Sequence, residues 1–74
     1  MKIVEVTWMD AHSQDAWHEK LESSLRSCQT AGYLVLDTDD AIVIAGMVDL
    51  EPPVTYACAM TIPKSAIKKM RKIG

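Results

Sequence analysis

Two histidines lie among acidic residues near the start of the chain and are the first candidates for metal chemistry. His12 and His18 stand six positions apart, a spacing that does not place them on one face of a helix. Zinc sites use closely spaced Cys and His ligands, and no cysteine is near these histidines in the sequence. We predict no metal site here and interpret both histidines as surface or packing residues. Their acidic neighbours are Asp10, Asp15 and Glu19.

A second acidic group, Asp37 to Asp40, matches the start of a calcium-binding loop. The later ligands and the glycine of an EF-hand loop are missing. Aspartate tolerates turn dihedrals and bonds to its own backbone, so this segment is predicted to be the turn of a hairpin. The chain has no nucleophile elbow and no glycine-rich phosphate loop. We therefore expect a non-enzyme with no catalytic residues and no cofactor.

Basic residues gather towards the end of the chain, where five of the eight Lys and Arg fall in the last eleven positions. The net charge of −2 argues against a general nucleic-acid binder. Repeated around a ring, however, this asymmetry would produce one basic and one acidic face. Phosphates bound there would release counterions, so that affinity would fall with salt. The alternative is a solvated, soluble tail. The cluster consists of Lys64, Lys68, Lys69, Arg71 and Lys72.

The elements that position these groups centre on residues 32–50. Two apolar runs rich in β-branched residues flank the acidic turn, which is typical of a hairpin. The runs do not alternate between apolar and polar, as an antiparallel hairpin with one wet face would. Both faces are therefore expected to be covered, one of them by a second copy. Gly32 and Gly46, inside the two strands, indicate sharp bends or a close approach of another backbone.

The segments before this hairpin are predicted to be a strand and a short helix. Lys2 to Trp8 alternates and is rich in strand-forming residues. Between Asp10 and Arg26, Ser13 is a suitable helix cap. Trp8 and Trp17 are expected to anchor the N-terminal segments to the core or to fill an interface; the alternative is that they stack on bases.

The segment from Val54 to Ile62 alternates most cleanly and is predicted to be a strand. Met60 is expected to be buried on its inner face. The small residues Ala57 and Ala59 on the other face allow close approach of a second backbone, so a subunit contact is predicted there. After Pro63, residues 66–73 form either a short basic helix or a closing strand.

Length and composition favour one small domain that assembles with copies of itself. A chain of 74 residues buries only about 60% of its unfolded surface, and small cores of aliphatic residues are often stabilised by oligomerisation. Cys28 and Cys58 are far apart and do not indicate a disulfide framework. The N-terminal residues lack the apolar core of a signal peptide. We expect a cytoplasmic protein with both thiols free and buried.

Two segments resemble the Sm-like proteins. In the first, Gly32 is followed by Asp37 or Asp39, an apolar strand, and then Asp49 and Glu51; this is similar to the first Sm signature. In the second, Ile62-Pro63-Lys64-Ser65-Ala66-Ile67 is similar to the signature in which a strand ends in Ile-Arg-Gly before a closing strand. Residues 6–11 and the acidic turn are also similar to short uncharacterised proteins of tailed phages.

The Sm resemblance implies a ring whose neighbours join edge strand to edge strand, with RNA bound near the pore. Sm proteins read a base with an Asn just after the hairpin turn, where this chain has Ala41 and Ile42. The Arg-Gly of the second signature is replaced by Pro63 and Lys64. The candidate nucleic-acid contacts are Lys64, Ser65, Lys68, Lys69 and Asp40.

We therefore expect one mainly β domain over residues 1–74, a small, strongly bent five-stranded SH3/Sm-like barrel with a short N-terminal helical segment. Copies are expected to form a cyclic homo-oligomer of about five to seven subunits, because a closed ring leaves no free strand edges. The predicted function is non-catalytic binding of RNA or a small nucleotide, without a membrane. The alternative is a phage-encoded interaction protein that blocks or sequesters a host component in the host cytoplasm.

Overall fold

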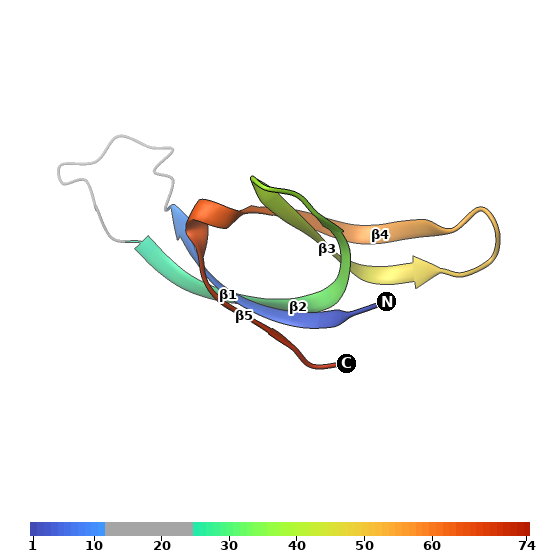
Figure 1. The fold of residues 1–74 in the computed structure, drawn as a ribbon, viewed down its shortest axis with the longest axis horizontal. Helices are drawn as coiled ribbons and strands as arrows, with labels where there is room; N and C mark the ends of the chain where they lie inside the picture. Colours follow the sequence, from blue (N-terminus) through green and yellow to red (C-terminus); the bar gives the residue numbers. More distant parts are fainter. Residues whose placement is uncertain (12–24) are drawn as a thin grey trace, which may run out of the picture.

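The computed structural model describes residues 1–11 and 25–74, which form a mainly β fold (Figure 1). Five strands make one antiparallel sheet in the order β4-β3-β2-β1-β5. The predicted helix between Asp10 and Arg26 falls mostly outside the described residues. His12, Trp17 and His18 lie outside them as well. The elements are β1 (Ile3–Ala11), β2 (Leu25–Asp37), β3 (Ala41–Asp49), β4 (Thr55–Pro63), the 3₁₀ helix η1 (Lys64–Ala66) and β5 (Ile67–Lys72).

The sheet is strongly bent and open. Two register shifts interrupt the ladders. One leaves Val35 of β2 as an extra residue opposite β3, and the other leaves Lys68 of β5 as an extra residue opposite β1. Such bulges bend a strand and increase its twist, and Figure 1 shows β2 curving from one side of the molecule to the other. Within the part of the chain that the structure describes, the outer strands β4 and β5 each pair with a neighbour on one side only.

The core lies in the hollow of this bent sheet. Alternate residues of β1 and β3 point into it, together with a single residue near the end of β4, which explains why short β-branched side chains dominate these strands. The partly buried Trp8, Leu34 and Ile67 pack against the core. Its buried members are Val4, Val6, Ile42, Ile44 and Ile62.

Trp8 joins β1 to β2 through its side chain as well as its backbone. The indole Nε1 of Trp8 donates a hydrogen bond to Thr30 Oγ1 at 3.0 Å. The Thr30 hydroxyl in turn lies 3.9 Å from the sulfur of Met60 on β4. The prediction that Trp8 anchors the N-terminal segment to the core is confirmed, because its ring packs there and its polar atom is satisfied.

Strand β4 departs most from expectation. Its predicted range is nearly correct, but the prediction that Met60 is buried is wrong, because 42% of this residue is exposed. The next inward position, Ile62, is completely buried. Met60 lies opposite Ile44, yet no further strand among residues 1–11 and 25–74 covers it, because β4 is an edge of the open sheet that they form.

The two cysteines are free, as predicted, but they are not both buried. Cys28 is partly buried and Cys58 is exposed on β4. Cys58 also has a positive φ of 56°, which is uncommon for a residue other than glycine. The expectation of two buried thiols is therefore wrong for Cys58, which belongs to a part of β4 that lies beyond the core.

The C-terminal segment is a strand rather than a helix, which settles the choice that the sequence left open. Residues 64–66 form η1, and the chain then pairs with β1 as β5. Within this pairing Val6 lies opposite Met70, and Glu5 lies opposite Arg71. Beyond β5, the amide of Ile73 donates a hydrogen bond to the carbonyl of Ile3 at 2.8 Å.

Candidate nucleic-acid interface

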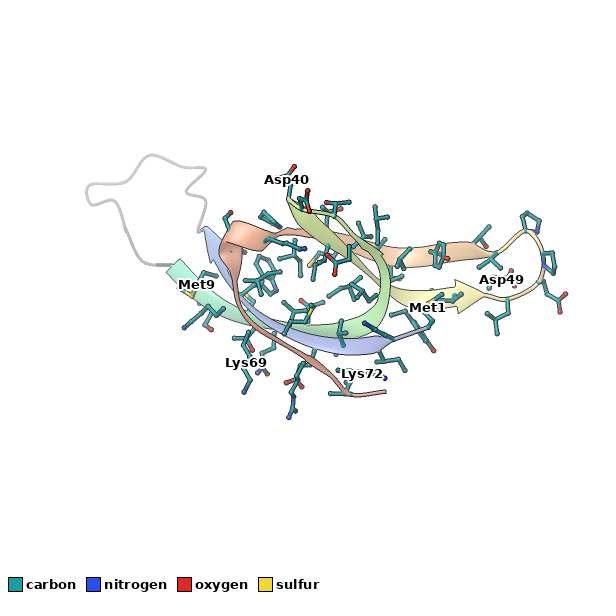
Figure 2. All side chains as sticks on the ribbon, in the orientation of Figure 1. Met1, Met9, Asp40, Asp49, Lys69 and Lys72 are labelled. Atoms are coloured by element: carbon teal, nitrogen blue, oxygen red, sulfur yellow. The ribbon has the colours of Figure 1, made fainter. Side chains whose placement is uncertain are left out.

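The hairpin turn between β2 and β3 is held rigid by a threonine. The amide of Thr38 donates to the carbonyl of Ala41 at 2.9 Å, closing the turn. The Thr38 hydroxyl accepts a hydrogen bond from the amide of Ala41 at 3.2 Å. Threonine and aspartate favour such turns because their short side chains bond to the local backbone. The turn therefore presents Asp39 and Asp40 to solvent, and Asp40 stands at its tip in Figure 2.

Lys64, the first residue of η1, lies beside this turn. Its backbone amide donates to the carbonyl of Asp40 at 2.8 Å. Its ammonium forms an ion pair with Asp37, with 2.6 Å between Nζ and Oδ1. The structure thus brings together two of the predicted contacts, Asp40 and Lys64, which are far apart in the sequence.

The remaining predicted contacts divide between two places. Ser65 is exposed on η1 beside Lys64, and Lys68 is exposed at the start of β5. Lys69 of β5 lies opposite Thr7 of β1. Figure 2 draws Lys69 on the far side of the ribbon from Asp40. We call the first place the turn–η1 surface. It consists of Asp37, Thr38, Asp39, Asp40, Lys64 and Ser65, and we add Lys68 to it because this residue follows the end of η1 by two positions.

Charge on the turn–η1 surface is mixed rather than basic. Three carboxylates stand in the turn, and one of them already neutralises Lys64. Among residues 1–11 and 25–74, no acidic side chain pairs with Lys68. An exposed ion pair such as Lys64–Asp37 is worth only about 0–1 kcal/mol, so an incoming phosphate can displace it. The surface can offer cations to phosphate and carboxylates to hydrogen-bond donors.

Three residues of this surface, Asp37, Thr38 and Asp39, were not among the predicted contacts. Asp37 determines where the Lys64 ammonium lies, and Thr38 shapes the turn. The sequence carries a signal for Thr38, since a threonine before two aspartates is a turn-forming pattern. It carries none for Asp37, because an ion pair between β2 and η1 depends on how the sheet bends.

A second feature of functional interest is the pair of free sheet edges. Strands β4 and β5 both expose apolar side chains, among them Tyr56 and Met60 on β4 and Met70 on β5. A free edge presents unpaired backbone donors and acceptors and is a template for pairing with another strand. The predicted contact residues Ala57 and Ala59 are exposed on the β4 edge.

Comparison of the chain with protein-family models, curated proteins and solved structures found no match. In the described ranges, no group of three His, Cys, Asp or Glu side chains is arranged to hold a metal ion. A membrane-crossing helix was also sought over the same residues, and none of the required length and hydropathy was found.

Proposed function

We propose that this chain is a non-catalytic protein of Sm-like architecture that assembles into a ring and binds RNA or a small nucleotide at the turn–η1 surface. The observation that carries the proposal is the contact of Lys64 with the β2–β3 turn. It joins the acidic turn to the segment after β4, and these are the two segments that carry the Sm resemblance.

Assembly is supported by the two free edges. An open five-stranded sheet leaves β4 and β5 each with one unpaired side, and joining β4 of one copy to β5 of the next would pair both. A cyclic arrangement of about five to seven copies would then close without free edges. The same pairing would complete the barrel that the bent sheet begins, because it would cover Met60.

RNA binding is supported by the chemistry of the turn–η1 surface. Lys68 and Lys64 are suited to phosphate oxygens, to which most protein–nucleic acid hydrogen bonds go. The carboxylate of Asp40 is suited to an exocyclic amino group of a base, as acidic side chains accept from cytosine N4. A ring would repeat the turn–η1 surface in every subunit, so weak contacts at the individual subunits would together increase the affinity for RNA.

The first experiment measures mass in solution by light scattering, with and without nuclease. We expect a multiple of 8.2 kDa for the parent, independent of nuclease. Ala59→Arg introduces a guanidinium at the β4 edge and should yield a folded monomer, judged by circular dichroism. A parent that is monomeric at micromolar concentration contradicts the ring.

The second experiment titrates salt against binding of a fluorescent single-stranded RNA of mixed sequence. Lys68→Gln should reduce the slope of log affinity against log salt by about 0.7 for each lost phosphate contact. Lys2→Gln removes an equal charge from an exposed position at the start of the chain and serves as the control. Identical slopes for parent and Lys68→Gln, or no binding at low salt, would refute RNA binding at this surface.

A further inference from the structure

The β3–β4 hairpin extends beyond the body of the molecule as a two-stranded arm, residues 46–58. Pairing between β2 and β3 ends at Tyr33 and Ala45, whereas β3 and β4 remain paired as far as Asp49 and Thr55. Figure 1 shows the arm projecting past both chain termini. An isolated two-stranded hairpin is marginally stable in water, so the arm needs a surface to pack on.

The arm is apolar along its length and acidic at its tip. Met47 is 56% exposed and Leu50 is 77% exposed, and both belong to this one hairpin. Met47 and Tyr56 line an open groove on the arm. Asp49 and Glu51 are exposed at the tip, with no basic residue between positions 46 and 58. Scattered apolar residues are ordinary, but four exposed apolar side chains on one short hairpin, Met47, Leu50, Val54 and Tyr56, indicate an interaction surface.

The opposite edge of the sheet has the complementary character. Met70 on β5 is 41% exposed and Ile73 just after it is 50% exposed. Lys69 and Lys72 are exposed along the same strand. Within residues 1–11 and 25–74, no acidic side chain forms an ion pair with either lysine. β5 thus offers apolar side chains flanked by positive charge, where the arm offers apolar side chains beside negative charge.

We propose that the arm of one copy lies on β5 of a second copy, with Asp49 and Glu51 facing Lys69 and Lys72 and with Tyr56 and Met47 packing against Met70 and Ile73. This inference rests on the proposed self-assembly and specifies its contact. The two surfaces differ, so the contact is head-to-tail and each copy uses both. Such heterologous contacts close into rings when the rotation allows it.

The test uses two variants with reversed charge. The arm variant carries Asp49→Lys and Glu51→Lys, and the β5 variant carries Lys69→Glu and Lys72→Glu. In either variant alone, arm and β5 have the same sign of charge, and like charges across an interface oppose association strongly. We expect self-association to weaken by at least about tenfold, measured by light scattering over a dilution series at low salt.

Mixing the two variants provides the decisive measurement. Each contact between the two variants then joins an arm and a β5 of opposite charge, so the mixture should assemble into chains or into rings with an even number of alternating subunits. A chain that carries all four substitutions should also assemble alone. The control Asp10→Lys with Asp39→Lys makes the same charge change outside the arm, at exposed positions, and should assemble like the parent.

The outcomes separate this inference from the proposed function. A parent oligomer with arm and β5 variants of unchanged mass would overturn the arm contact and leave the ring intact. Loss of assembly in both variants, without recovery on mixing or in the chain that carries all four substitutions, would also overturn it, because the charges would not then be partners. A monomeric parent would overturn the ring and the arm contact together. Recovery on mixing supports the contact as described.

Discussion

Gly32 on β2 lies directly against the main chain of Ala45 on β3. A Cβ atom built on Gly32 would be 2.6 Å from the Ala45 carbonyl oxygen and 2.7 Å from Ile44 Cγ2. Ala45 and its neighbour Ile44 are both buried, so the obstacle includes backbone that cannot move aside. Of the two alternatives predicted for Gly32, a sharp bend or a close approach, the close approach is confirmed. It lies on the longest strand, two residues before the register shift that begins at Leu34.

Gly32→Ala should therefore lower the free energy of unfolding by about 1–3 kcal/mol, the usual range for overpacking. Urea denaturation followed by circular dichroism measures the change. The matched control is Gly46→Ala, where the nearest atom to a new Cβ is a side-chain carbon, Cys58 Cβ, at 3.3 Å. Equal stability of the Gly32 variant and the parent would contradict the close approach.

Ile62→Ala and Met60→Ala compare how much the buried end of β4 and its exposed part contribute to the free energy of unfolding. Ile62 is fully buried, and its truncation should cost about 2–5 kcal/mol through lost burial and a cavity. Met60 is 42% exposed, so Met60→Ala should change the stability of the monomer by less than about 1 kcal/mol. Unfolding is measured in the monomeric Ala59→Arg background, where no subunit contact contributes. Similar losses for both variants would show that Met60 belongs to the core.

The contribution of the hydrogen bond between Trp8 and Thr30 to stability can be measured by a double-mutant cycle. Trp8→Phe removes the donor and Thr30→Val removes the acceptor, and each should cost about 0.5–1.5 kcal/mol for the bond itself, in addition to any loss of packing. The double variant should lose less than the sum of the single losses, because the partners act on each other. Strict additivity in thermal or urea unfolding would mean that the bond contributes nothing to stability.

Asp37→Asn should strengthen RNA binding at the turn–η1 surface. The substitution frees the Lys64 ammonium from its ion pair and removes one negative charge beside the bound phosphate. We expect affinity to rise by about two- to fivefold at low salt, with the gain fading as salt screens the charges. Asp10→Asn is the control, since it changes the charge equally at an exposed position on β1. A loss of affinity in Asp37→Asn would indicate that the carboxylate itself contacts the ligand.

Much of the strand layout follows from local sequence. β-branched runs in residues 3–8 and 41–48 predict β1 and β3, and the turn between β2 and β3 follows from its aspartates. The period of the C-terminal residues is equally compatible with helix and strand, so β5 could not be assigned from them. Its pairing with β1 decided the matter, because hydrogen bonds to a distant strand override weak local preference.

The candidate site was predicted in part. The basic cluster is visible in the sequence as one group, yet the fold separates Lys64, beside the turn, from Lys69 on the far side of the ribbon. The bulge in β5 leaves Lys68 as an extra residue opposite Thr7 and Trp8 of β1, and such an irregularity alters which way successive side chains point. The spacing of basic residues in the sequence does not predict this irregularity.

By itself, the sequence determined that this chain is mainly β, where its central hairpin turns, and that Gly32 marks a sharp bend or a close approach. Those features depend on the backbone preferences of individual residues and their neighbours. Only the tertiary structure decided that Ile62 is buried while Met60 is exposed, and that Lys64 pairs with Asp37. Burial and ion pairing depend on which strands lie at the edge of the bent sheet, and therefore on contacts between residues far apart in the chain.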